Sequence, residues 1–274
     1  MTVTNAVETT MIWGTVSGAS MVGMVISLLL SVGLPIFLCI FIYKKTKAWV
    51  PAFFIGCGIF VGFAMILEQI CHAIVLTVTG SAIRDNIWLY AIYGGLAAAL
   101  FEECGRWIAM KFCLKKHLTR ENALMYGAGH GGIEAFLILG MSSMSNLLTA
   151  AMINGGLMEK TMTALEPAQQ EVTYHQLSVL WTTPAYQFYL APVERISAIA
   201  LQIALSILVY SAVKTGRKLH LAAAFGLHFA VDFLTVICAA AIPTWVLELG
   251  LLLVVAVICV VVYQLVYVQM AEKK

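Results

Sequence analysis

The stretch LAAALFEECGRWIAMKF, from Leu96 to Phe112, decides how this chain must fold. It is apolar enough to cross a membrane as a helix, yet Glu102, Glu103 and Arg106 lie near its middle. A charge near the centre of a bilayer costs at least about 2.5 to 3.5 kcal/mol, even on the most lenient insertion scales. The three charges must therefore be paired inside the protein or face a polar cavity.

The whole chain has the composition of an integral membrane protein. Of its 274 residues, 61% are hydrophobic and 11% are charged, and the mean hydropathy is +0.92. Because a helical span needs about 20 apolar residues, the recurring apolar runs predict an all-α, polytopic protein with seven transmembrane helices in one domain, 1–274. The expected spans lie near residues 16–43, 49–79, 86–113, 121–141, 185–213, 218–241 and 243–270, with an outer loop over 142–183.

Positive charges are concentrated in every second connection between the expected spans. The connections after the first, third and fifth spans are basic, as is the end of the chain, whereas the others hold only Arg84 and Lys160. Since short basic loops stay in the cytoplasm, we expect the N-terminus outside and the C-terminus in the cytoplasm. Membrane lipids are therefore expected partners.

Other features exclude several classes of protein. All seven cysteines fall within expected spans and form no CxxC pair, which argues against a disulfide framework or a zinc ribbon. There is no basic patch with interleaved aromatic residues, so nucleic acid is not an expected partner. In the long outer loop, residues 146–165 have the pattern of an amphipathic helix at the membrane interface.

Polar residues in spans three to six fall at one depth in the membrane. Because a helix rises about 1.5 Å per residue, the depth of a side chain can be counted from the basic loop that anchors its span. Glu68 in span two lies nearer the outer face, as part of an outer shell or of a separate network. The count places a layer about 15 to 21 Å from the cytoplasmic boundary that contains Glu102, His130, Gln202, His228 and Asp232.

Helical spacing groups these residues into pairs. Residues four apart share a helix face, so His130 pairs with Glu134 and His228 pairs with Asp232. In span three, Arg106 can pair with one of the two glutamates within one turn but cannot compensate both. One carboxylate is left over.

A carboxylate of this kind suits general base catalysis. Held in a dry site, it can take a proton from water and return one to a leaving amine. A nearby neutral histidine can orient the water or donate to an oxyanion, and the glycines of GAGHGG let a backbone or a substrate approach His130. These parts suit peptide hydrolysis inside the membrane.

Two other interpretations stay open. Buried Glu and Arg side chains also mark ion pairs and transport pathways, so a transporter or channel could use the same cluster for proton or ion coupling. A non-catalytic membrane scaffold is the third possibility. Transporters often contain inverted repeats, and no clear repeat is visible here. Glu194 and Arg195, adjacent on span five, fit a packing ion pair as well as a supporting role.

The motifs resemble one family of membrane peptidases. The sequence lacks HExxH, a GxGD-type aspartate pair and GxSxG. It is similar to the glutamate intramembrane proteases related to the CAAX prenyl proteases, which carry EExxxR, aromatic-xxx-His and HxxxN or HxxxD. Here EECGR occupies 102–106, YGAGH 126–130 and HFAVD 228–232. The similarity is closer to the bacterial YhfC branch, where EExxR, GHGGIEA, ER and HxxxD occur in this order, and it covers about residues 60–240.

The resemblance implies an intramembrane endopeptidase in a bacterial plasma membrane. Its substrate would be a membrane-bound peptide or protein, reached laterally or from the cytoplasmic side. Glu102 would activate the attacking water, while Glu103 with Arg106 would hold that water in place. His130 would position the water or the substrate.

Further residues complete the implied site. His228 with Asp232 would supply the oxyanion site and handle protons. Two departures stand out: EExxR in place of EExxxR moves Arg106 by about 100° around the helix, and Gln202 stands where we expect a histidine in this branch. Glutamine can form hydrogen bonds but cannot shuttle a proton at neutral pH. The supporting residues would be Glu134, Glu194, Arg195 and Gln202.

The use of a metal is a further alternative. Metal-free activation of water by Glu102 is the favoured interpretation, with no cofactor. Zinc remains possible, because two histidines and two carboxylates are a suitable ligand set. The residues that could hold it are His130, Glu134, His228 and Asp232.

Overall fold

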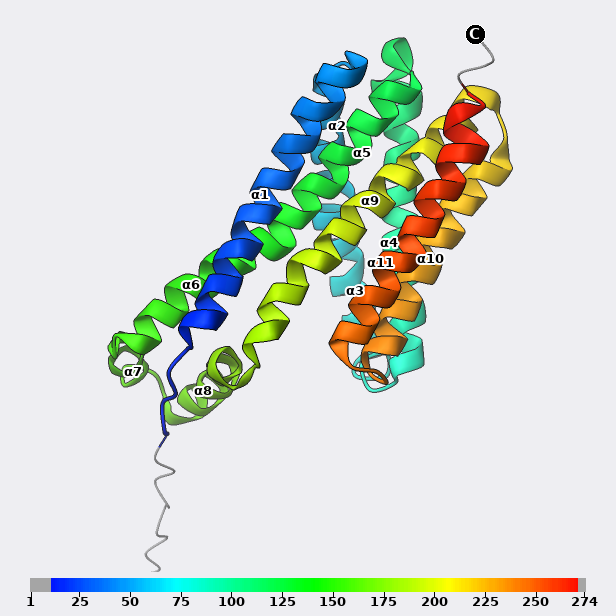
Figure 1. Cartoon of the computed structure of the whole chain (residues 1–274). Helices are drawn as coiled ribbons and strands as arrows, with labels where there is room; N and C mark the ends of the chain where they lie inside the picture. The colour runs from blue at the N-terminus through cyan, green and yellow to red at the C-terminus, as the bar shows by residue number, and fades with distance from the viewer. Residues whose placement is uncertain (1–10, 271–274) are drawn as a thin grey trace, which may run out of the picture.

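The computed structural model describes residues 11–270, whose long helices form one bundle (Figure 1). Seven helical segments are long and apolar enough to cross a membrane, which confirms the predicted all-α, polytopic fold. They are α1 (Gly18–Thr46), α2 to α3 (Pro51–Thr79), α4 with η2 (Ile87–Cys113), α5 to α6 (Arg120–Asn154), α9 (Ala185–Thr215), α10 (Lys218–Ala239) and α11 with η5 (Thr244–Val268).

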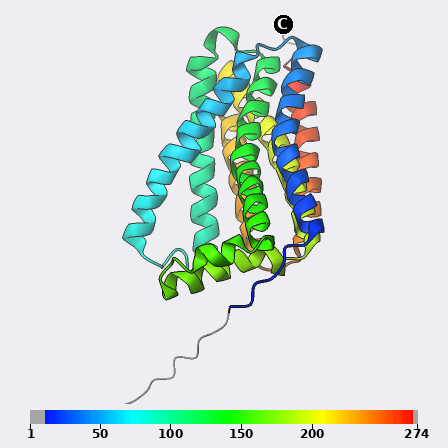
Figure 2. The same cartoon turned by 90° about the vertical axis from the view of Figure 1, so that its left-hand side faces the viewer.

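The basic connections gather at one end of the bundle, which we call the basic end. It holds the turn after α1, the 3-10 helix η3 (Lys115–His117) and the turn between α9 and α10, all at the top of Figure 1. The opposite end carries two short helices, α7 (Leu157–Met162) and α8 (Pro167–Thr182), which run across the ends of the long ones (Figure 2). The alternation of charge seen in the sequence thus matches two distinct ends of the molecule.

The fourth segment is longer than the sequence suggested. Helix continues past residue 141 through α6 (Met141–Asn154), so the first part of the expected outer loop belongs to the spanning segment. The expected amphipathic helix over 146–165 is therefore wrong, because Gly155 and Gly156 interrupt it and Gly156 has a φ of +70°. Only glycine adopts that conformation readily.

Short π-helical stretches interrupt two of the spanning segments and end two others. They are η1 (Val61–Glu68), η2 (Ala109–Cys113), η4 (Phe136–Gly140) and η5 (Tyr263–Val268). π-Helical turns change the direction of the side chains that follow and often occur near functional sites. In this chain η1 ends at Glu68 and η4 begins two residues after Glu134, so two of them adjoin buried carboxylates.

Helix α5 (Arg120–Ala135) lies at the centre of one half of the bundle, packed by α1, α2 (Pro51–Phe60) and α9. Its glycines allow this packing. A Cβ on Gly129 would lie 1.9 Å from the Phe53 carbonyl oxygen of α2, and a Cβ on Gly127 would lie 2.7 Å from Ile203 Cα of α9. The glycine-rich motif therefore brings neighbouring backbones against α5 on two sides.

The other half of the bundle is the antiparallel pair α4 (Ile87–Ile108) and α10, with α9 between this pair and α5. Helix α11 (Thr244–Val262) packs against α9. The segment from η1 to α3 (Gln69–Thr79) leans away from α5 and α6 towards the opposite end (Figure 2). The polar residues of α4, α5, α9 and α10 therefore face one another where the two halves meet.

Candidate active site

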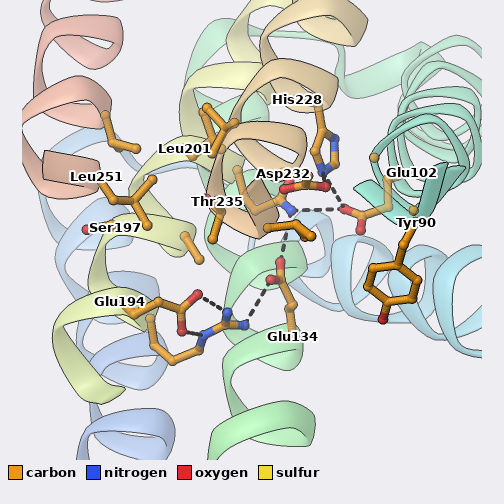
Figure 3. A pocket seen from close by; sticks show the side chains of 18 residues that line it. Tyr90, Glu102, Glu134, Glu194, Ser197, Leu201, His228, Asp232, Thr235 and Leu251 are labelled. Carbon is orange, nitrogen blue, oxygen red and sulfur yellow. Dashed lines mark hydrogen bonds and ion pairs between the residues drawn. The ribbon is translucent and has the colours of Figure 1, made fainter. Parts of the chain in front are cut away.

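Glu102 lies at the point where the side chains of four helices meet (Figure 3). Its Oε2 atom is 2.9 Å from His130 Nε2 on α5 and accepts a 2.9 Å hydrogen bond from Gln202 Nε2 on α9. Arg106 Nη2 and His228 Nε2 each lie 3.9 Å from the same oxygen. Since an ionised carboxylate only accepts hydrogen bonds, all four neighbours can stabilise its charge.

Arg106 is completely buried and directs its guanidinium towards α9. Nη1 donates to the Gln202 carbonyl oxygen and to Ser206 Oγ, both at 2.7 Å, and Nη2 donates to Gln202 Oε1. Nε lies 3.1 Å from Glu103 Oε2, close enough for an ion pair but not aligned for a hydrogen bond. The sequence left open which of the two glutamates pairs with Arg106, and the structure brings Glu103 nearer than Glu102. Arg106 also anchors α4 to α9.

Gln202 joins the arginine to two carboxylates. Its Oε1 accepts from Arg106, while its Nε2 donates to Glu102 Oε2 at 2.9 Å and to Glu134 Oε2 at 2.8 Å. A guanidinium can only donate, so the oxygen of the amide must face Arg106. The amide nitrogen must then face the two carboxylates, which fixes the orientation of the side chain.

His228 connects Glu103 with the polar face of α10. Its Nδ1 atom is 2.8 Å from Glu103 Oε1, so a proton on Nδ1 would be donated to that carboxylate. Its Nε2 atom lies 3.5 Å from Asp232 Oδ2 and 3.9 Å from Glu102 Oε2. Glu103 thereby holds the ring so that Nε2 faces Glu102 and the more accessible Asp232, whose side chain is 36% exposed.

Glu134, Glu194 and Arg195 form a second group of charges. It lies next to Glu102 and its neighbours, on the side that faces away from the basic end. Arg195 Nη1 donates to Glu134 Oε1 at 3.1 Å, and two other nitrogens of Arg195 bond the carboxylate of Glu194 on the same helix. Because Glu134 also bonds Gln202, this group is continuous with the first. The structure thus joins in one network all ten residues singled out in the sequence: Glu102, Glu103, Arg106, His130, Glu134, Glu194, Arg195, Gln202, His228 and Asp232.

The network borders a cavity of about 320 Å³. The cavity extends from Glu102 towards the opposite end, where Tyr90, Ser197 and Thr235 line it together with apolar residues of α11. The sequence does not distinguish these three hydroxyl groups, or Ser206 beside Arg106, from others, because hydroxyls are common in membrane helices. Helical spacing does point to Thr235, because it lies three residues after Asp232 and so shares its helix face.

Glu68 lies in a network with partners of its own. Its Oε1 atom is 3.2 Å from His72 Nε2, and His72 Nδ1 is 2.8 Å from the Tyr93 hydroxyl on α4. Both Glu68 and His72 belong to the segment that leans away in Figure 2. Of the two alternatives open for Glu68, these contacts with His72 and Tyr93 favour a separate network.

As placed, the side chains do not form a coordination sphere for a metal ion. Within residues 11–270, no group of three or more His, Cys, Asp or Glu side chains is arranged to hold one. Glu134, one of the four candidate ligands, instead bonds two side chains of α9. Glu102, His130 and His228 are the nearest alternative set, but the Glu102 oxygen between the histidines already contacts His130 and Gln202. The donors are therefore engaged with one another.

Sequence comparisons agree with the motifs. The model of the YhfC intramembrane metalloprotease family matches residues 30–259, and the chain belongs to this family. It is also 43% identical over 204 residues to the "Uncharacterized membrane protein YhfC" of Bacillus subtilis (strain 168), which covers 71% of this chain and 76% of that protein. No solved structure matches the chain. The predicted resemblance is thus confirmed, and the family description supports a peptidase in the membrane.

Proposed function

We propose that the protein is an intramembrane endopeptidase in which Glu102 activates the attacking water without a metal ion. The observation that carries this proposal is the position of Glu102, buried among donors from four helices yet lining the cavity. A general base must be fixed and must reach the water it deprotonates. The family is described as a metalloprotease, so the metal-free mechanism is our own proposal, and the contacts of Glu102 with His130 and Gln202 support it.

Each neighbour then has a role in the hydrolysis. A water in the cavity gives a proton to Glu102 while its oxygen adds to the carbonyl carbon of the substrate. His130, 2.9 Å from Glu102, keeps the carboxylate in place. His228 Nε2 faces the same region and, with the ring protonated on both nitrogens, is the proposed donor to the oxyanion that develops. Asp232 supports His228 from the cavity side.

Glu103 and Arg106 act behind these groups. The charge of Arg106 compensates Glu103, and Glu103 in turn orients His228 through Nδ1. Removal of one partner of a buried ion pair leaves an uncompensated charge, which typically costs about 3 to 5 kcal/mol. We therefore propose that both residues position His228 and hold α4 against α9.

The substrate we propose is a membrane-bound peptide or protein. The cavity extends from Glu102 away from the basic end of the bundle. Leu251 and Val255 form its apolar wall. We propose that a substrate reaches Glu102 from this half of the membrane. With the basic end in the cytoplasm, this is the outer half of a bacterial plasma membrane, the N-terminus is outside and the C-terminus is cytoplasmic.

The test is proteolysis by the purified protein in proteoliposomes that contain a set of membrane peptides. We expect the wild type to cleave at least one of them, and we expect Glu102→Gln to abolish cleavage without changing the melting temperature much. Glu171→Gln is the matched control, because Glu171 is exposed on α8. Equal cleavage by wild type and Glu102→Gln would remove Glu102 from the reaction. Absence of cleavage together with ion-dependent uptake would support a transporter.

A further inference from the structure

We propose that Glu134 is the general acid of this site and gives its proton to the leaving amine. The inference rests on the proposed peptidase function and adds a second carboxylate to it. It follows from the way in which Gln202 holds two carboxylates of different helices at the same cavity.

Gln202 sets the distance between the two carboxylates. One nitrogen atom, Gln202 Nε2, donates to Oε2 of Glu102 and to Oε2 of Glu134. The two oxygens therefore cannot lie further apart than the sum of the two hydrogen bonds, which measure 2.9 and 2.8 Å. Figure 3 shows both carboxylates beside the same cavity, Glu102 from α4 and Glu134 from α5. A scissile peptide bond at this cavity can contact both.

The two carboxylates have different electrostatic surroundings. Glu102 has Arg106 and His228 at 3.9 Å and His130 at 2.9 Å. The cation beside Glu134 is Arg195, which also binds Glu194 through two of its nitrogens. Two buried carboxylates this close do not both ionise cheaply, and one retains a proton. The surroundings assign the charge to Glu102 and the proton to Glu134.

The hydrogen bonds of Glu134 leave room for that proton. Arg195 donates to Oε1 and Gln202 donates to Oε2. Each carboxylate oxygen has two lone-pair positions, so a proton on Oε2 can coexist with the bond from Gln202. That oxygen is also the one nearer Glu102, which is where the scissile bond would lie.

The protons balance over one turnover. Water gives one proton to Glu102 and its oxygen bonds to the carbonyl carbon, while the carbonyl electron pair moves to oxygen. When that pair returns, the C–N bond breaks and the amine nitrogen takes the proton of Glu134. The products are a carboxylic acid and an amine. Transfer of the proton from Glu102 to Glu134 through cavity water restores the starting state.

A comparison of two leaving groups tests this role. The first substrate is a membrane peptide that the wild type cleaves, and the second is the same peptide with a thioester at the scissile bond. A thiol ionises near pH 8.5, so a thiolate leaves without receiving a proton. We expect Glu134→Gln to slow cleavage of the amide by about 100-fold or more. The factor by which the same variant slows cleavage of the thioester should be at least ten times smaller. Glu102→Gln, which removes the base, should slow both substrates to a similar degree.

The other outcomes are distinct. Equal loss on both substrates in Glu134→Gln would show a structural role and overturn the proposal, as would unchanged cleavage of the amide. Thermal unfolding of the variant and the thioester rate itself report whether the site still folds. Glu134→Asp, which keeps an acid, should recover part of the amide cleavage. If the wild type cleaves none of the membrane peptides from which the first substrate is chosen, the proposed function is refuted, and this inference with it.

Discussion

Arg106 and Gln202 fix one another across the interface of α4 and α9: the guanidinium donates to both the carbonyl and the side-chain oxygen of Gln202. Because these bonds use the oxygen of the amide, its nitrogen is left for the carboxylates of Glu102 and Glu134. The arginine thus determines the surroundings of two carboxylates to which it donates no hydrogen bond.

Replacing the amide of Gln202 by a carboxylate should destabilise the protein in a pH-dependent way. In Gln202→Glu, an acceptor replaces the N–H donors that face Glu102 and Glu134, and each buried group left unsatisfied costs about 1 to 3 kcal/mol. A protonated carboxyl can donate again, so the loss should shrink as the pH is lowered. Thermal unfolding between pH 5 and 8 measures this difference.

The control for that series is Gln202→Leu, which removes the donors without adding a charge. Its loss of stability should not depend on pH in the same way. A parallel pH dependence in both variants would show that the effect arises elsewhere in the molecule.

Arg106→Met should destabilise the protein more than Arg106→Lys. Methionine leaves Glu103 buried without its cation, a change that typically costs about 3 to 5 kcal/mol. Lysine keeps a charge but cannot reproduce the fork that reaches Glu103, Ser206 and Gln202 at once. Melting temperatures in one detergent compare the three proteins, and the opposite order would contradict a compensating role for Arg106.

Gly129→Ala should loosen the contact between α2 and α5. The added methyl group would lie 1.9 Å from the Phe53 carbonyl oxygen, so the helices must move apart. Overpacking of this kind costs about 1 to 3 kcal/mol, occasionally more. Gly58→Ala on α2 is the matched control, because no atom lies within 4 Å of its added Cβ. Equal melting temperatures for the two variants would argue against close packing at Gly129.

Removal of metal ions should leave the hydrolysis intact. If Glu102 activates water without a metal, protein treated with a chelator should cleave its substrate at nearly the rate of untreated protein. Metal analysis of the same samples is needed alongside the rates. Stoichiometric zinc whose loss abolishes cleavage, and whose return restores it, would replace this mechanism by a metal-dependent one at the same residues.

The sequence predicted the helical fold because the hydrophobic requirement of a bilayer acts on every span. It also predicted which polar residues would share a depth, since the rise of a helix is fixed. His130 and Gln202, assigned by counting to the same layer as Glu102, both contact its carboxylate. Depth and helix face are both local properties, and both can be obtained without knowing which helices are neighbours.

Contacts between helices could not be predicted in this way. Spacing placed Arg106 within reach of Glu103, but the choice of α9 as its second partner depends on how the helices pack. The end of the fourth segment was missed for a different reason. Its serines resemble a loop, yet Ser142 Oγ bonds the carbonyl oxygens of Ile138 and Leu139 within the helix. Serine satisfied in this manner is compatible with a membrane helix.

The polar network has a mechanical consequence as well as a chemical one. It lies where α9 joins the half of the bundle built on α5 to the pair α4 and α10, so the groups proposed for catalysis also fasten the two halves together. In many enzymes, a substitution that relaxes a strained active site makes the fold more stable. Here a substitution that breaks the contacts of the network would also loosen the joint between the two halves. Only a change that keeps the shape of the side chain, such as Glu102→Gln, is expected to remove activity and leave the stability nearly unchanged.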